Sequence, residues 1–361
     1  MNKQGSYPVI NGGIEPSGYI EQYNQDENTI TIAQGGSAGF VNWITTKFWA
    51  GAHCYIIISK DNILNRYLYH FLKSKEYELQ KYKYGAGIPA LAKSAINQLQ
   101  IPVPPLHIQA EIVRILDNFT ELTSELISEL TARKKQYEYY RDELLTFNSN
   151  CKNRKFIDVD LQSVQSVKDS YYINEMKEFI KKICAYKIKI MELSKICDIT
   201  KGIQFNKSNM NKQGSYPVIN GGIEPSGYIE QYNQDENTIT IAQGGVSAGF
   251  VNWITTKFWA GAHCYVIIPK DNILNRYLYH FLKSKEYELQ KYQYGAGIPA
   301  LSKSIINQLK IPVPSLPIQN EIIRILDNFT ELTSELTAEL TARKKQYEYY
   351  RDKLLTFTKA D

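Results

Sequence analysis

The chain contains two nearly identical copies of one sequence unit. Residues 1–147 reappear as residues 210–357, and about nine in ten positions agree. The first copy lacks one residue, because Gly36-Ser37 stands where the second copy has Gly245-Val246-Ser247. A unit of this length has the size of a domain rather than of a solenoid repeat. We therefore expect an intramolecular pseudo-dimer and a partner that presents its contact surface twice.

Composition limits the class of protein. The 361 residues are 43% hydrophobic, which is typical of a folded globular chain. The net charge of +5 permits a polyanionic partner but is a weaker signal than the strongly basic pI of many nucleic-acid-binding domains. The start, MNKQGSYPVI, has no signal-peptide pattern, and no run of 18 apolar residues occurs. We expect a soluble, cytoplasmic protein with no membrane contact.

The five cysteines indicate reduced thiols rather than a disulfide framework. There is no Cys-x-x-Cys pair, and Cys54 and Cys264 are the same position in the two copies. The adjacent His53 and Cys54 do not form a metal site, because neighbours on a strand point to opposite faces. No metal site is expected.

The first part of each unit reads as mixed α/β. The segments 216–222, 236–245, 249–254 and 261–268 have strand patterns that end in Gly or Asn-Gly turns. Residues 275–292 have a helical apolar stripe that includes Leu278, Phe281 and Leu289. Three prolines in 312–317 then lead into a new helix.

The second part of each unit is a long helix with heptad spacing. Phe329, Leu336, Arg343 and Tyr350 recur every seven residues, and a complementary seam runs from Thr333. The first copy repeats both seams. Each helix needs a partner, which the other copy supplies. If the two helices pair as an antiparallel coiled coil, one α/β module lies at each end.

These patterns divide the chain into five parts. We expect a first α/β domain at 1–110, a first long helix at 111–147, a connector at 148–190, a second α/β domain at 191–317 and a second long helix at 318–357. Within the connector, 149–170 looks polar and 171–190 looks like a short amphipathic helix. The segment 192–205 looks like the opening of a module, with a helical turn followed by a strand.

An ordered series of phrases, most of them present twice, resembles a known family. The series is ELSKICDITKGIQF, YPVINGGIEPSGYI, ENTITIAQGGVSAGFVNW, FWAGAHCYVI, NRYLYHFLKS and GAGIPALSKSIINQLKIPVPSLPIQNEIIRILD. It is similar to the specificity (S) subunits of type I restriction–modification systems over essentially the whole chain. The resemblance implies two α/β target-recognition domains, each reading half of a bipartite DNA site. It also implies two helices that dock two modification methyltransferase subunits in a complex with restriction/translocase subunits.

One departure from the family affects the first copy. It begins at the equivalent of Met210, so it lacks a counterpart of residues 192–209, and its recognition domain is missing its first strand or two. Three explanations stay open: the start lies upstream, the gene was rearranged, or the C-terminal end and residues 148–190 fill the gap.

Near-identical modules related by a two-fold axis read the same short sequence on opposite strands. We therefore expect a near-palindromic target, with one half-site, an unread spacer and the inverted complement. Two rival interpretations are a free-standing two-fold DNA-binding regulator and a recombination product of this family with a defective first domain. A structural repeat protein is a third, and it would show no salt-dependent DNA binding.

The candidates for DNA contact are polar residues at strand ends and turns, together with one tryptophan in each copy. In the second copy they are Lys201, Gln204, Asn206, Lys207, Asn220, Gln243, Ser247, Trp253 and Lys303. In the first copy they are Asn11, Gln34, Ser37, Trp43 and Lys93. The alternative is that Asn220 and the Gly pairs only form turns and that Trp253 fills the core. For the repeated ARKKQYEYYRD, a solvated coiled-coil flank competes with phosphate or partner contact.

The sequence shows no catalytic signature. It has no P-loop, no amino-methyltransferase tetrapeptide and no nuclease pattern, and GGVSAG lies between strands rather than before a helix. We expect a non-enzymatic subunit with no cofactor of its own. The resemblance places S-adenosylmethionine, ATP and Mg²⁺ on the partner subunits.

Overall fold

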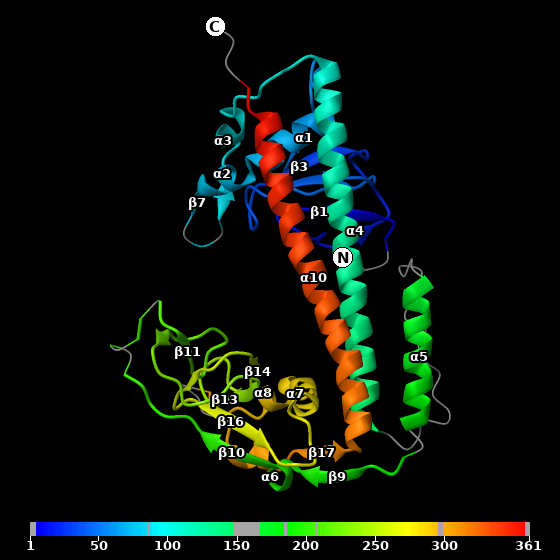
Figure 1. The fold of residues 1–361 in the computed structure, drawn as a ribbon. Coiled ribbons are helices and arrows are strands. Elements are labelled where there is room, and N and C mark those ends of the chain that lie inside the picture. The colour runs from blue at the N-terminus through cyan, green and yellow to red at the C-terminus, as the bar shows by residue number, and fades with distance from the viewer. Residues whose placement is uncertain are drawn as a thin grey trace. The chain divides into compact units, whose positions relative to one another are not determined.

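The fold was analysed in a computed structural model of the chain (Figure 1). The structure describes residues 5–85, 87, 89–147, 167–183, 186–206, 208, 210, 211, 213–294 and 299–357. Residues 148–166 of the expected connector at 148–190, and Lys207, lie outside these residues. The chain divides into two compact units, and each unit combines one α/β domain with one half of each long helix. The first unit is 1–128 with 336–361, and the second is 129–335.

The elements follow the same order in both copies. The first copy contains β1 Tyr7–Ile10, β2 Tyr19–Ile20, β3 Thr29–Ala33, β4 Val41–Ile44, β5 Trp49–Ala50, β6 Cys54–Ile57, α1 Asn65–Ser74, α2 Glu76–Lys81, β7 Lys83–Tyr84, β8 Ala90–Leu91, α3 Lys93–Asn97 and α4 Leu106–Thr146. Then come α5 Val167–Ile183, β9 Lys189–Glu192, α6 Leu193–Ile196 and β10 Cys197–Lys201. The second copy contains β11 Tyr216–Ile219, β12 Tyr228–Ile229, β13 Thr238–Ala242, β14 Val251–Ile254, β15 Trp259–Ala260, β16 Cys264–Pro269, α7 Asn275–Ser284, α8 Glu286–Lys291, α9 Lys303–Asn307, β17 Lys310–Val313 and α10 Leu316–Leu355.

The central sheets of the two copies differ by one strand. The second unit has a four-stranded sheet in the order β10-β16-β13-β14, and the first has β4-β3-β6. Each unit also contains a small three-stranded sheet. Its middle strand, β1 or β11, pairs antiparallel with one neighbour and parallel with the other. The alternation of Ile239 and Ile241 with Thr238 and Thr240 predicted β13, and both isoleucines are completely buried.

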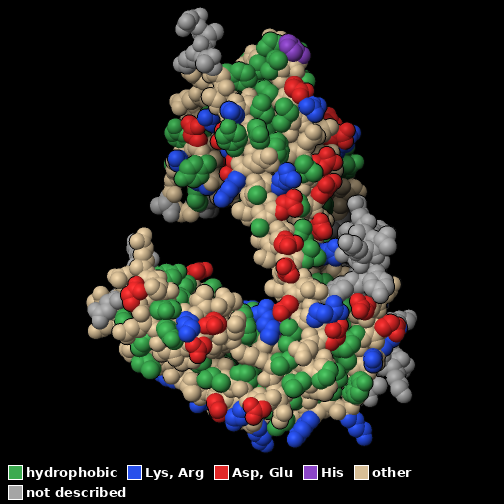
Figure 2. All heavy atoms as spheres, in the orientation of Figure 1, with side chains coloured by type: hydrophobic (Ala, Val, Ile, Leu, Met, Phe, Trp, Pro, Cys, Tyr) green, Lys and Arg blue, Asp and Glu red, His purple; other side chains and the backbone are tan. Residues whose placement is uncertain are grey.

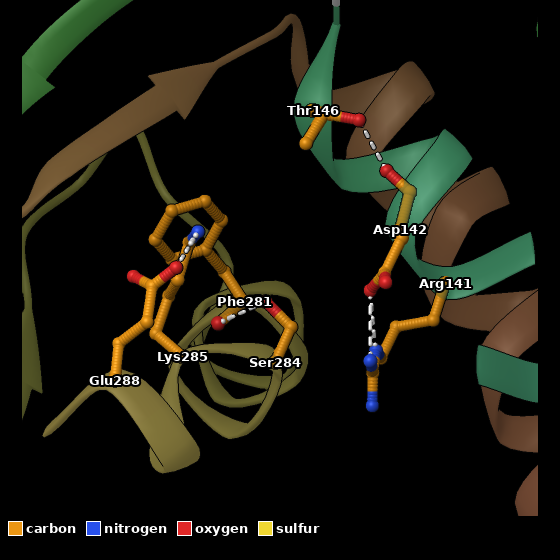
Figure 3. A network of polar contacts seen from close by, with 7 residues as sticks. All are labelled: Arg141, Asp142, Thr146, Phe281, Ser284, Lys285 and Glu288. Carbon is orange, nitrogen blue, oxygen red and sulfur yellow. Dashed lines mark hydrogen bonds and ion pairs between the residues drawn. The ribbon is translucent and has the colours of Figure 1, made fainter. Parts of the chain in front are cut away.

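The helical stripe at 275–292 forms two helices rather than one continuous helix. Ser284 Oγ donates a hydrogen bond of 2.7 Å to the carbonyl of Phe281, and α7 ends there. Lys285 then pairs with Glu288 at 3.1 Å in the first turn of α8, as Figure 3 shows. These contacts close the last turn of α7 and turn the chain into a second short helix. The amphipathic pattern of 171–190 likewise becomes α5 followed by β9.

The long helices α4 and α10 pack against each other (Figure 1), as the heptads predicted. In the first unit, the Phe119 ring stacks on that of Tyr350 with a centroid distance of 5.6 Å. In the second unit, Tyr140 stacks on Phe329 at 6.0 Å. The first half of α4 contacts the last half of α10, and the last half of α4 contacts the first half of α10, so the two helices are antiparallel. The duplicated α/β architecture with an antiparallel helix pair is confirmed.

Each unit has its own buried core. In the second unit one cluster joins the sheet, α7 and the two helix halves, and α5 adds Met176, Ile180 and Ile183 to it. In the first unit the sheet packs on α1 in one cluster, and Ile112 and Leu116 of α4 pack with Tyr67 and Leu355 in another. The domain in each unit is therefore joined to the helix pair by apolar packing.

Candidate nucleic-acid interface

The turns that follow several strands meet on one face of each α/β domain, because glycines let their backbones approach closely. In the second unit, a Cβ on Gly221 would lie 2.3 Å from the carbonyl oxygen of Gly244, and one on Gly202 would lie 2.2 Å from that of Gly261. No side chain fits at these distances. We call residues 202–206, 220–222, 243–247 and 299–303 the loop face of the second unit.

Backbone hydrogen bonds hold the loop face in place. The amide of Gln243 donates to the carbonyl of His263 at 2.8 Å, and the amide of Leu301 donates to the carbonyl of Gln243 at 2.7 Å. Gly245 donates to Pro299 at 2.9 Å. The turn after β13 is thereby fixed against the segment that leads into α9.

Four of the candidates in the second unit are exposed on or beside the loop face. They are Lys201, Gln204, Asn206 and Lys303. Lys201 ends β10, and Lys303 is the first residue of α9. The structure therefore brings two lysines and two amide side chains to the same region, which are the groups that contact phosphates and base edges.

The other candidates in the second unit are half-buried, and two of them have clear structural roles. Asn220 Nδ2 donates to Ser226 Oγ at 3.3 Å within the turn, and its Oδ1 occupies the space beside Gly261. The Trp253 ring lies 5.5 Å from that of Tyr279, with the Arg276 guanidinium 4.9 Å above it. These placements fit the alternative of turn formation and core packing. Gln243 and Ser247 belong to the turn itself.

The first unit repeats this arrangement with two changes, of which the first is that the described residues contain no counterpart of 202–206. Asn11, Gln34 and Ser37 are half-buried, Lys93 is exposed, and Trp43 packs on Tyr69 and Arg66 as its counterpart does. The loop after β3 is one residue shorter, and its Ser37 amide donates to the carbonyl of Gly12 at 2.7 Å. This loop is therefore bonded to the turn after β1, and it keeps the 2.7 Å bond from the amide of Leu91 to the carbonyl of Gln34.

Sequence reasoning missed a row of exposed tyrosines beside the loop face. Tyr292 and Tyr294 are 57% and 58% exposed, and Tyr82 and Tyr84 are 54% and 58% exposed. Tyr294 and Ala300 exchange backbone hydrogen bonds of 2.9 Å, so Tyr292 and Tyr294 lie close to the 299–303 segment of the loop face. The signal was present as Tyr-x-Tyr before a Gly-rich segment, where the first tyrosine follows the last helical residue of α2 or α8.

A basic edge was also missed. Figure 2 shows Lys and Arg side chains along the border of the second unit that α6, β9 and β10 form. Lys195 and Lys310 both lie near Glu192, at 4.0 and 2.7 Å, and Lys270 pairs with Asp198 at 3.2 Å. These ion pairs partly neutralise the edge.

The repeated basic–aromatic stretch on the long helices makes contacts along its own helix. Figure 3 shows Arg141 beside Asp142, and their closest atoms are 2.8 Å apart. The Arg141 guanidinium also lies 5.7 Å from the ring centre of Tyr137. Such pairing on one helix supports the interpretation as a coiled-coil flank.

A buried polar network joins each domain to its long helix. In the second unit, Asp327 of α10 accepts hydrogen bonds from Arg276 Nε and His280 Nε2 of α7, each at 2.8 Å. His280 is 1% exposed. Arg66, His70 and Asp117 repeat the network in the first unit. Neither sequence periodicity nor spacing predicted it, because its residues lie 47 or 51 positions apart.

Burial controls the charge of these histidines. It lowers the pKa of His280 and of His70, although each is hydrogen-bonded to an aspartate that opposes the shift. Hydrogen bonds from His280 and Arg276 outweigh burial at Asp327 and lower its pKa. With Nε2–H donated to the aspartate, Nδ1 has no hydrogen-bond partner in either ring, so a second ring proton would be buried without an acceptor.

We expect the free energy of unfolding to decrease as the pH falls below about 6.5, the ordinary pKa of histidine. The unfolded chain takes up protons at His70 and His280 there, whereas the folded chain does so only at lower pH, so acid favours unfolding. Urea unfolding between pH 5 and 7.5 measures this dependence. His70→Gln with His280→Gln should flatten it, and His107→Gln, at an exposed position, should not. A slope unchanged by the double variant would contradict the assignment.

The described residues contain no group of three or more His, Cys, Asp or Glu side chains placed to hold a metal ion. Cys264 is completely buried, and burial raises the pKa of its thiol to about 12. Among the described parts of the chain, no helix is both long enough and apolar enough to span a membrane.

Comparisons with known proteins show which family has this architecture. A family model described as the type I restriction modification DNA specificity domain matches residues 1–133 and 186–343. A Haemophilus influenzae protein described as a type I restriction enzyme specificity subunit is 31% identical, over 99% of this chain and 90% of that protein. The EcoR124I/EcoR124II specificity subunit of Escherichia coli is 29% identical over 74% of this chain and 66% of its own length.

Solved structures agree at the level of the fold. The S subunit of a type I restriction–modification system from M. genitalium superposes with a TM-score of 0.70 at 20% identity, covering 99% of this chain and 91% of that one. With two matches to the family model, one in each copy, the chain belongs to the type I restriction–modification specificity subunit family.

Proposed function

We propose that this chain is the DNA-recognition subunit of a type I restriction–modification complex and has no catalytic activity of its own. The observation that carries the proposal is the pair of nearly identical domains, each with a loop face, in a chain that matches the DNA specificity model twice. Exposed lysines and amide side chains on the second loop face support DNA as the ligand.

Each domain would read one half of a bipartite site. Lys201 and Lys303 have the chemistry for phosphate contacts, and Gln204 and Asn206 have the chemistry for base edges in the major groove. The exposed tyrosines close to the 299–303 segment offer apolar surface beside them. In the first unit Lys93 and the turn after β3 take the corresponding places.

The repeated sequence supports a near-palindromic target. Each unit contains the same Phe–Tyr stack with the roles of the two helices exchanged, so the two copies of the sequence make equivalent contacts in their own units. If a two-fold axis relates the two copies of the domain on DNA, they would read one short sequence on opposite strands.

The same proposal assigns the chemistry to other chains. Two modification methyltransferase subunits would dock on this protein and supply S-adenosylmethionine, and restriction/translocase subunits would supply the sites for ATP and Mg²⁺. A cavity of about 530 Å³ between α1, α2 and the helix pair of the first unit, lined by Tyr69, Tyr77, Thr123 and Tyr347 among others, is one surface that such a subunit would cover.

Co-expression with a type I modification subunit should produce a new methylated motif with two inverted, matching halves. Modification-sensitive long-read sequencing of DNA from these cells, compared with cells that lack this chain, measures it. A motif whose halves are unrelated would contradict the near-palindromic target. A motif with a single read half would show that the first domain is defective, which is one of the alternatives above.

Two lysine variants test the loop face in the same cells. Lys303→Ala should reduce the fraction of sites that are methylated, because a phosphate contact is lost, and should leave the motif unchanged. Lys181→Ala removes the same charge from α5, where the lysine pairs with Glu178 at 2.5 Å, and should have no effect. A free-standing regulator would instead bind its site with full affinity without the modification subunit.

A further inference from the structure

The two copies form an internal comparison, because the same residues are buried in one unit and exposed in the other. In β16 of the second unit, Cys264, Val266 and Ile267 are completely buried. Their counterparts in β6, which are Cys54, Ile56 and Ile57, are all partly exposed. The difference arises because β10 pairs with β16 along its whole length, whereas β6 pairs only with β3 among the described residues.

A second difference lies just before the long helices. In the second unit, β17 pairs with β9, and Ile311 is completely buried. The corresponding segment of the first unit, 100–103, forms no strand among the described residues. Ile101 is only half-buried there, and Val103 is 53% exposed.

A third difference lies on the long helices. Tyr140 of α4 is 3% exposed, and it shares a cluster with Met176, Ile180 and Ile183 of α5. Its counterpart on α10, Tyr350, is 40% exposed. The same holds two turns earlier, where the side chain of Arg133 is 10% exposed and that of Arg343 is 42% exposed.

All three surfaces are covered in the second unit by one continuous segment, α5-β9-α6-β10. We propose that the first unit carries an acceptor site for a polypeptide segment of this same chemistry, an amphipathic helix followed by two short strands. The acceptor site consists of the outer edge of β6, residues 100–103 and the helix stripe from Arg343 to Leu354. Its occupant is a segment with the sequence pattern of residues 174–205.

The backbone of β6 presents the required hydrogen-bonding groups. In the second unit Cys264 accepts a bond of 3.1 Å from Gly202, next to β10, and His263 accepts one from Gln243 on the β13 side. Because neighbouring residues of an antiparallel strand bond to opposite sides, the carbonyl of Cys54 and the amide and carbonyl of Ile56 face the open edge of β6, as do those of Ile58 just after it. An added strand pairs with these groups.

The first unit also has basic residues at two of the three positions where acidic residues of the segment form ion pairs in the second unit. In the second unit Asp198 pairs with Lys270, Glu175 lies 4.0 Å from Arg324, and Glu192 pairs with Lys310. By the repeat, Lys60 and Arg114 occupy the first two of these basic positions in the first unit, and Gln100 occupies the third. A second copy of this chain is a less suitable donor, because its own segment is already buried in its second unit.

The test uses a fluorescent peptide of residues 174–205 and the full-length chain. Fluorescence anisotropy should show one peptide bound per chain, and hydrogen exchange should show protection at 54–58 and in the last turns of α10. Ile56→Pro should weaken binding by roughly tenfold or more, because it removes an amide from the open edge and leaves the pairing with β3 intact. Arg114→Glu, at an exposed position, should weaken binding through Glu175 without affecting folding.

A graft separates a failed peptide from a failed proposal. Residues 167–209 joined directly before Met1 keep the spacing of the second copy, so the graft should raise the melting temperature of the first unit and abolish peptide binding. Absence of binding together with an unchanged melting temperature of the graft would overturn the proposal. So would binding that neither Ile56→Pro nor the graft reduces, or protection at 264–268 instead of 54–58. None of these measurements uses DNA, so the result is independent of the proposed function.

Discussion

Phe329→Ala is expected to destabilise the second unit by about 3–5 kcal/mol, the usual cost of removing a buried phenyl ring. Phe329 is 5% exposed, stacks on Tyr140 at 6.0 Å and lies 6.3 Å from Tyr137. Its removal leaves a cavity where α4, α10 and the core of the domain meet. Because the chain has two units, unfolding should be followed by hydrogen exchange of α10 amides during urea titration rather than by one global signal.

Phe119→Ala is the matched control in the first unit. Phe119 stacks on Tyr350 at 5.6 Å, but it is only half-buried, and Tyr350 is itself 40% exposed. The same substitution should therefore cost less there. Equal losses in the two units would contradict the conclusion that the helix pair is more fully packed in the second unit.

Gln319→Leu is expected to destabilise the second unit by about 2–5 kcal/mol, since it removes the partner of three backbone groups that are buried or partly buried. Gln319 is completely buried. Its Oε1 accepts a 2.8 Å bond from the amide of Leu274, at the start of α7, and its Nε2 donates to the carbonyls of Asn272 and Pro314 at 3.1 and 2.8 Å. Leucine is close in size and makes none of these bonds.

Urea unfolding of this variant should also show whether the side chain fixes α7 to the long helix. Gln109→Leu should have a similar effect in the first unit, where the same three bonds are present. Gln98→Leu, at an exposed position, is the control for the change in composition and should shift stability by less than about 0.5 kcal/mol. A loss no larger than that of the control would show that the network adds little.

Much of the fold could be predicted from the sequence, because its signals are local and periodic. The alternation in 236–245 predicted β13, and the heptads from Phe329 predicted α10 and its pairing with α4. The opening of the second module at 192–205 was also predicted as a helical turn and a strand, which correspond to α6 and β10. Duplication made each pattern easier to interpret, since it occurred twice.

Features that depend on distant residues could not be predicted in this way. Asp327 and His280 are 47 positions apart, and Gln319 reaches back 45 positions to Leu274. No periodicity joins such pairs. The candidate interface was predicted only as residue types at turns. A tryptophan such as Trp253 is suited both to a DNA contact and to packing. Only the fold shows that it lies beside Arg276 and Tyr279.

The loop after the third strand occurs in this chain in two lengths, which differ by one residue. In the longer version Gly245 is bonded to the segment before α9, and in the shorter version Ser37 is bonded to the turn after β1. Nearly everything else around the loop is identical in sequence. The two copies thus differ by one residue in this loop, in addition to the missing counterpart of residues 192–209, so a change confined to the loop separates the effect of its length from that of the missing strand.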